Sequence, residues 1–89
     1  MGHINLRIKI MPASPNSDLK KIEEATKKTV EKEGGKGCMF VQEPIAFGLK
    51  AVIVTFIFPE EKEIDPLEGH LAKIKDVNSV QIIDMRRAL

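Results

Sequence analysis

Residues 49–58 read LKAVIVTFIF, and this run decides the fold. Side chains alternate between the two faces of a strand, and here both faces are apolar. One face carries Val52, Val54, Phe56 and Phe58, and the other carries Leu49, Ala51, Ile53, Thr55 and Ile57. Because both faces are apolar, the run predicts a central strand that is covered on one side and well shielded on the other.

Two more strands and a helix are predicted before this run. Residues 3–11 place polar and apolar side chains strictly in turn, which is the period of a half-buried strand, and Pro12 ends it. Ser17 or Asp18 can cap a helix that continues to about residue 33, where the glycines of 34–37 stop it. A weaker strand is predicted over residues 38–42.

A second helix and a last strand are predicted after the central strand. Asp65 is the expected helix cap, with Pro66 at the first helical position and Glu68 three residues after the cap. Its inner stripe is formed by Leu67, Leu71 and Ile74. The last strand is expected over 79–85, which leaves residues 86–89 as a tail.

The predicted order is strand, helix, strand, strand, helix, strand. This order is typical of the ferredoxin-like α+β sandwich, a βαββαβ fold in which two helices cover one face of a four-stranded antiparallel sheet. A chain of 89 residues has no room for two cores, so we expect residues 1–89 to form one domain.

Composition excludes several classes of protein. The net charge of +1 gives no basic footprint for direct nucleic-acid binding, and no apolar run approaches the ~20 residues of a membrane span. The single cysteine, Cys38, cannot form an internal disulfide, so we expect an intracellular, cytoplasmic protein. As a residue at a strand start, Cys38 is interpreted as a packing residue rather than a reactive thiol.

The residues that carry covalent or metal chemistry are poorly represented. His3 and His70, the only histidines, are expected on the surface, and no nucleophile, base and acid are arranged as a triad. The first loop has no pair of cysteines for a metal, and the first strand offers no outer aromatic residue for stacking on RNA bases. Gly34–Gly37 precedes a strand rather than a helix, so it is a helix stop and not a phosphate loop. We therefore expect no metal, no cofactor and no enzymatic activity.

Two segments call for a functional interpretation. Residues 43–49, EPIAFGL, join two strands, yet they carry Ile45 and Phe47 where polar turn residues are usual. Phe47 is either a core residue at a bulged strand start or an exposed anchor for a partner pocket, which is a typical binding hot spot. At the other end of the chain, Arg86 and Arg87 form either a solvated tail or cationic fingers aimed at a partner's carboxylates, phosphates or metal site.

These segments, together with IMPASP at 10–15, resemble the guanine-nucleotide exchange domain of translation elongation factor 1-beta. The match is most specific over EPIAFGLKA at 43–51, DMRR at 84–87 supports it, and the whole chain resembles the archaeal form of the family. The resemblance implies the ferredoxin-like fold and one partner, the GDP-bound form of elongation factor 1-alpha, a GTPase whose GDP release the family accelerates.

The resemblance also implies roles for particular residues. Phe47 corresponds to an aromatic residue that docks on a non-catalytic domain of the GTPase, and its neighbours are implied in the same contact: Glu43, Pro44, Ile45, Ala46, Gly48 and Lys50. In the eukaryotic form a lysine next to the C-terminus reaches toward the magnesium and phosphate site. Here that position is Ala88, which departs from the family pattern, and we expect Arg86 or Arg87 to serve instead of the lysine.

Two rival functions have weaker support from the sequence. A small-molecule-binding regulatory domain of the same fold would have a glycine-bearing loop after the first strand, and an acylphosphatase-like enzyme would have an arginine there. Residues 11–16, MPASPN, contain neither.

Overall fold

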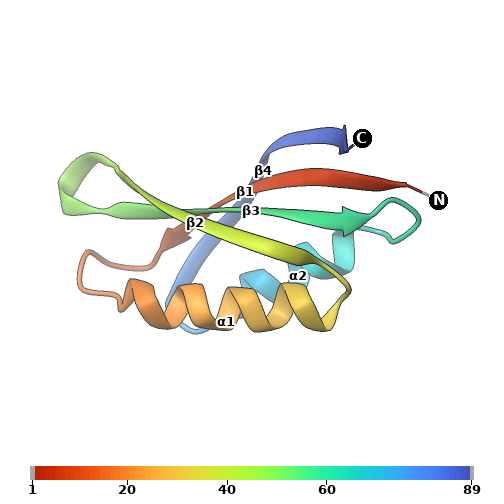
Figure 1. Cartoon of the computed structure of the whole chain (residues 1–89). Coiled ribbons are helices and arrows are strands. Elements are labelled where there is room, and N and C mark those ends of the chain that lie inside the picture. The colour runs from red at the N-terminus through yellow and green to blue at the C-terminus, as the bar shows by residue number, and fades with distance from the viewer. Residues whose placement is uncertain (1, 89) are drawn as a thin grey trace.

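The order of elements is the predicted one. The structure, a computed structural model, describes residues 2–88, so Met1 and Leu89 of the predicted single domain lie outside the described residues. The described strands form one antiparallel sheet in the order β2-β3-β1-β4, which confirms the ferredoxin-like α+β fold (Figure 1). The elements are β1 (His3–Pro12), α1 (Leu19–Lys32), β2 (Lys36–Pro44), the 3-10 turn η1 (Ala46–Gly48), β3 (Lys50–Pro59), α2 (Asp65–Ala72) and β4 (Val77–Ala88).

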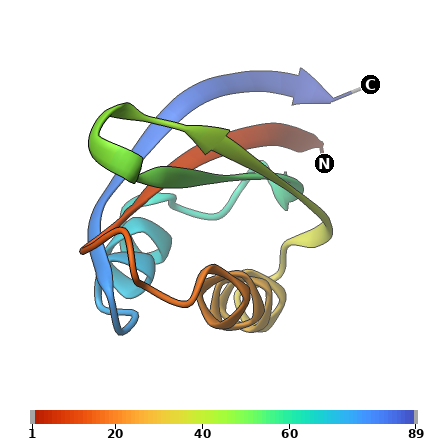
Figure 2. The ribbon, with the colours of Figure 1, turned by 90° about the vertical axis from the view of Figure 1, so that its left-hand side faces the viewer.

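Both helices lie on the same face of the sheet, and the core fills the space between the two layers (Figure 2). The phase of the alternation in β1 and β3 decides this face, because Leu6 lies opposite Phe56 and Ile8 opposite Val54. The fully buried core consists of Leu6, Ile8, Ile10, Ile22, Val30, Val52, Val54, Phe56, Phe58, Leu67 and Leu71. Among the described residues, no helix covers the other face of the sheet, which we call the open face.

Helix α1 begins and ends where the sequence predicts. The Asp18 carboxylate accepts a hydrogen bond from the Lys21 amide at 3.3 Å, so Asp18 rather than Ser17 is the cap. Past the helix, Gly34 has a φ of +104°, and the Gly35 amide donates to the Val30 carbonyl at 2.9 Å. This bond satisfies a carbonyl at the helix end, which confirms the glycine stop.

The predicted start of α2 is wrong by one residue. Ile64 is the N-cap and already has helical backbone angles, and the Glu68 amide donates to its carbonyl at 3.0 Å. Asp65 therefore lies inside the first turn, where its charge favours the helix dipole but its side chain does not cap, and Pro66 takes the second helical position. Leu67 and Leu71 are buried as predicted.

Two strands are longer than predicted. Strand β2 extends to Lys36 and Pro44, and β4 covers Val77–Ala88 instead of residues 79–85. The reason is pairing with a neighbour, since β4 is hydrogen-bonded to β1 from Pro12↔Val77 to His3↔Ala88. Backbone pairing does not require an apolar side chain, and edge strands often carry charged ones, so side-chain alternation underestimates the length of an edge strand.

Within residues 2–88, neither helix is long and apolar enough to cross a membrane.

Candidate functional site

The first candidate region is the tip of the β2–β3 hairpin, residues 45–49. The Ile45 amide donates to the Leu49 carbonyl at 2.7 Å, and the Leu49 amide donates to the Ala46 carbonyl at 3.3 Å. These bonds close the hairpin around η1, so the tip is an ordered turn rather than a loose loop.

Phe47 lies at the centre of this turn in an unusual conformation. Its φ of 62° and ψ of 31° are in the left-handed region, which costs a residue with a side chain roughly 1–2 kcal/mol. Gly48 follows with a φ of 77°, which glycine adopts without that cost. The Phe47 side chain is 93% exposed, so the prediction of an exposed residue is confirmed and the core alternative is wrong.

The remaining residues of the predicted contact surround Phe47 on the same tip. At the end of β2, Glu43 pairs with Ala51 and Pro44 pairs with Lys50. Glu43, Pro44 and Lys50 are exposed, whereas Ala51 is buried. Ala46 and Gly48 are exposed as well, whereas Ile45 is half-buried and supports the turn. On the far side of the turn, Pro15 of the β1–α1 loop lies about 4.0 Å from where a Cβ on Gly48 would sit. Two segments of the family resemblance thus meet at one end of the sheet.

The second candidate region is the C-terminal end of β4. The sequence predicted that Arg86 and Arg87 lie in a tail beyond the last strand, and this is wrong. Both residues belong to β4, where Arg86 pairs with Asn5 and Arg87 with Ile4 of β1. The Arg86 Nε lies 3.1 Å from the Asp84 carboxylate, and the Arg87 guanidinium lies 2.7 Å from the Glu60 carboxylate. Asp84 belongs to the DMRR segment of the resemblance, but nothing in the sequence of residues 59–63 marks Glu60 as the partner of Arg87.

A bulge in β4 decides which way each arginine points. Ile82 pairs with Ile8 and faces the core, but the register shifts before Asp84, which pairs with Arg7. Strict alternation from Ile82 would turn Arg86 toward the helices. With the extra residue Ile83, Arg86 instead lies on the open face of the sheet, and Arg87 lies on the side of the helix layer.

The two candidate regions lie at opposite ends of the molecule. β1 and β4 are antiparallel, and β3 runs antiparallel to β1, so the end of β4 is remote from the β2–β3 turn (Figure 1). The longest dimension of the molecule is 42 Å, and the sheet spans it. A pairing of Phe47 with the arginines in one pocket is therefore excluded. Any partner that engages both must extend along the protein.

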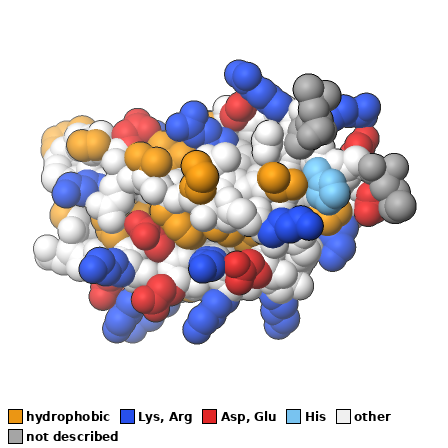
Figure 3. All heavy atoms as spheres, viewed as in Figure 1, with side chains coloured by type: hydrophobic (Ala, Val, Ile, Leu, Met, Phe, Trp, Pro, Cys, Tyr) orange, Lys and Arg blue, Asp and Glu red, His pale blue; other side chains and the backbone are white. Residues whose placement is uncertain are grey.

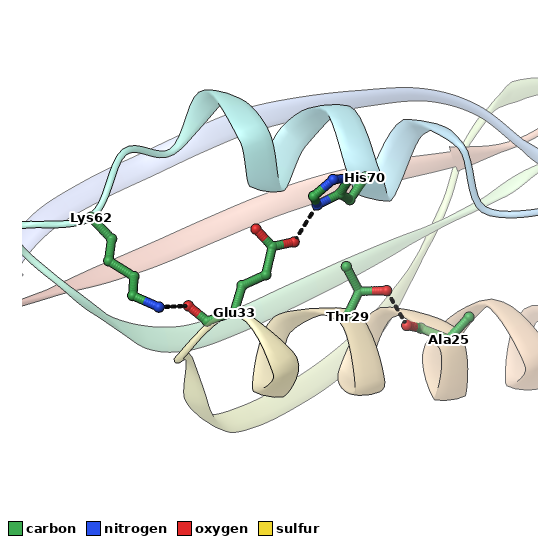
Figure 4. Close-up of polar contacts among 5 residues, drawn as sticks. All are labelled: Ala25, Thr29, Glu33, Lys62 and His70. Atoms are coloured by element: carbon green, nitrogen blue, oxygen red, sulfur yellow. Dashed lines mark hydrogen bonds and ion pairs between the residues drawn. The ribbon is translucent and has the colours of Figure 1, made fainter.

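A third group of polar residues joins the two helices (Figure 4). His70 Nδ1 of α2 lies 2.6 Å from the Glu33 carboxylate at the end of α1, and Lys62 donates to the Glu33 carbonyl at 2.8 Å. The His70 side chain is 57% exposed, and His3 is exposed too, as predicted. The group holds helix ends together and has no nucleophile within it.

The thiol of Cys38 is half-buried against the core. Burial raises the pKa of this thiol, the Glu31 carboxylate raises it further, and the Lys27 ammonium opposes them. A raised pKa lowers the thiolate fraction at neutral pH, which agrees with a packing role. Within residues 2–88, no three His, Cys, Asp or Glu side chains converge as they would around a metal ion.

Comparison with known proteins assigns the chain to a family. The profile described as the EF-1 guanine nucleotide exchange domain matches residues 5–88. Proteins named Elongation factor 1-beta are similar over nearly their whole length. The relative from Methanosarcina barkeri is 42% identical over 98% of this chain and 99% of its own. The relative from Methanocaldococcus jannaschii is 39% identical over 99% of this chain and 100% of its own.

Proposed function

Because the chain belongs to the EF-1 guanine nucleotide exchange domain family, we propose that it promotes exchange of GDP for GTP on elongation factor 1-alpha. Archaeal proteins named Elongation factor 1-beta support a role in translation elongation. In this proposal the chain acts in the cytoplasm by binding the GDP-bound GTPase, and it performs no covalent chemistry and uses no cofactor.

The exposure of Phe47 is the observation that carries the proposal. Leaving a phenylalanine 93% exposed forfeits roughly 1.5–3 kcal/mol of burial free energy in the free protein. The backbone around Phe47 is strained and ordered, so the conformation of the turn holds the ring in solvent. Such a ring recovers the burial energy when it enters an apolar pocket of a partner.

The arginines of β4 supply the second contact. Their ion pairs with Asp84 and Glu60 are solvent-exposed, and such pairs contribute only ~0–1 kcal/mol each. The guanidinium groups can therefore exchange these carboxylates for the anionic groups of a nucleotide site at little cost. A cation placed there competes with Mg²⁺ for the same oxygens and weakens the hold on GDP.

The sheet connects these two contacts as a rigid spacer. Phe47 and the arginines are both attached to strands, at opposite ends of a molecule 42 Å long. Binding energy from the Phe47 end can thus hold the arginine end in position at a distant site on the GTPase. By linkage, a factor that weakens GDP binding must itself bind the GDP-bound form more weakly than the empty form.

The test is release of a fluorescent GDP analogue from elongation factor 1-alpha, measured with and without this chain across a Mg²⁺ series. We expect the chain to accelerate release, and we expect Mg²⁺ to inhibit it, because the metal and the arginines oppose each other. The variants are Phe47→Ala, Arg86→Ala and Arg87→Ala, since deleting residues 86–89 would also break pairing of β4 with β1. Lys28→Ala, an exposed cation on α1, is the matched control for the loss of one positive charge.

Each outcome has a distinct meaning. No acceleration by the wild-type chain at any Mg²⁺ concentration would reject the exchange activity. Acceleration that survives both Arg→Ala changes would reject the cationic fingers and leave the Phe47 contact as the proposed site.

A further inference from the structure

We propose that the open face of the sheet is a third contact surface for the same GTPase, placed between the two ends, and that it receives an acidic, amphipathic segment of that partner. The inference rests on the proposed function, because it takes the identity of the partner from there. It adds a surface that neither the hairpin tip nor the arginines include.

The open face is divided into an apolar half and a charged half. The register across β2, β3, β1 and β4 sets Met39, Thr55, Arg7 and Asp84 in one row. The next row is Val41, Ile53, Lys9 and Gln81. The apolar members come from β2 and β3, and the charged members come from β1 and β4.

The outer edge of the apolar half is exposed, whereas its inner member Ile53 is only 4% exposed. Met39 is 67% exposed and Val41 is 56% exposed, and both project from an edge strand. In Figure 3, hydrophobic side chains are exposed along the sheet, whereas charged side chains of both signs gather over α1 below it. A hollow of about 460 Å³ crosses the boundary between the two halves, and its lining includes Met39, Ile57, Arg7 and Arg86.

Arg86 connects this face to the proposed exchange site. Because of the bulge in β4, its side chain lies on the open face and lines the hollow, whereas Arg87 turns to the other side. A partner held at both ends of the sheet and in contact with Arg86 must pass beside this hollow. Contacts made only by Phe47 and the arginines would form a small interface. A phenylalanine buries ~150–250 Å², whereas a stable protein interface buries ~800 Å² on each partner.

The charges of the face indicate what kind of segment fits. On β1 and β4 the open face carries three cations, Arg7, Lys9 and Arg86, and one carboxylate, Asp84, so the charged half is complementary to acidic groups. The other open-face carboxylate, Glu43, lies at the hairpin end of β2. A second copy of this chain would set cations against cations or bury them on Met39 and Val41, and both arrangements cost free energy. RNA is disfavoured because the open-face residues of β1 and β3 include no Phe, Tyr or Trp on which a base could stack, and the net charge of the chain is only +1.

The experiment compares binding of matched neutral variants to GDP-bound elongation factor 1-alpha. The double variant Met39→Gln/Val41→Thr removes apolar surface, adds no charge and should leave the melting temperature nearly unchanged. The control is Met85→Gln, because Met85 is also 56% exposed but lies opposite Leu6, on the other side of the sheet. Phe47→Ala serves as the reference for the proposed function.

We expect the double variant to bind roughly tenfold more weakly, and the control to bind as the wild type does. We also expect Arg7→Gln to slow association at low salt. If Phe47→Ala weakens binding but the double variant does not, the open-face contact is overturned and the proposed function stands. If the wild type does not bind the GTPase at all, both are overturned. If sedimentation shows a dimer of the free chain that the double variant disperses, the face is a self-association surface and the inference is wrong.

Discussion

The phenylalanine in the turn before β3 and the two phenylalanines near the end of β3 have opposite environments. Phe56 and Phe58 are 1% exposed and meet edge to face, with ring centroids 6.1 Å apart, whereas Phe47 is 93% exposed in the turn that precedes the strand. The strand buries its aromatics where helices cover it, and the turn carries its aromatic beyond the reach of those helices. Residue type alone therefore does not determine burial. Phe56 and Phe58 stabilise the fold, whereas Phe47 is held in solvent, where a partner can contact it.

The largest expected effect is on the buried side of this comparison. Phe56→Ala should lower the free energy of unfolding by about 3–5 kcal/mol, because it leaves a cavity among fully buried neighbours. Urea unfolding monitored by circular dichroism measures this loss. The fraction that remains folded should still bind the GTPase normally, and a binding defect per folded molecule would contradict the separation.

On the exposed side, Phe47→Ala should leave the free energy of unfolding nearly unchanged and cost on the order of 2 kcal/mol in binding to elongation factor 1-alpha, as truncation of a binding hot spot does. Titration calorimetry gives the binding constant, and a thermal melt of the same sample provides the control. An early melt combined with normal binding would show that the ring supports the fold instead.

The third prediction concerns a polar residue in the core. Thr26 is fully buried, and its hydroxyl has no hydrogen-bond partner among the described residues. Thr26→Val keeps the shape and removes the unsatisfied group, so it should raise the free energy of unfolding by about 1 kcal/mol. The same denaturant titration measures it, with Thr29→Val as the control, because the Thr29 hydroxyl donates to the Ala25 carbonyl at 2.8 Å. Equal effects in both variants would contradict the assignment.

The fourth prediction separates stability from binding at a single residue. Asparagine tolerates the left-handed conformation better than phenylalanine, so Phe47→Asn should stabilise the protein by roughly 0.5–1 kcal/mol. It should weaken binding at the same time, because the apolar ring is lost. Thermal melts and titrations of one preparation test both signs. If Phe47→Asn instead lowers the free energy of unfolding, the Phe47 side chain does not strain the backbone at its φ of 62°.

The smallest effect concerns the charged flanks of the tip. Reversing both charges with Glu43→Lys and Lys50→Glu should alter the association rate a few-fold at low salt and leave dissociation nearly unchanged, as is typical of rim charges. Stopped-flow mixing at two salt concentrations measures both rates. An association rate that does not respond at low salt would place these residues outside the contact.

Much of this architecture could be predicted from the sequence, since periodicity is a local property. The alternation in β1 identified its apolar face, Ser17 or Asp18 and the glycines after residue 33 bounded α1, and the composition of 43–49 pointed to the tip. In β3 both faces are apolar, so the choice of core face and of Asp18 as the cap came only from the structure. The start of α2 was misplaced because Ile64 adopts helical angles without any capping side chain, which no residue pattern announces.

What the sequence determined by itself was the set of elements, their order and the side chains available to each, because these follow from backbone propensities and from patterns a few residues long. Only the tertiary structure decided the geometry of the candidate site. Pairing of β4 with β1 turned an expected tail into an edge strand, and the register shift opposite Arg7 and Ile8 placed Arg86 on the open face and Arg87 on the other. The physical reason is that the facing of a side chain in a sheet depends on hydrogen bonds to a strand far away in sequence, and one extra residue in that ladder reverses every side chain beyond it.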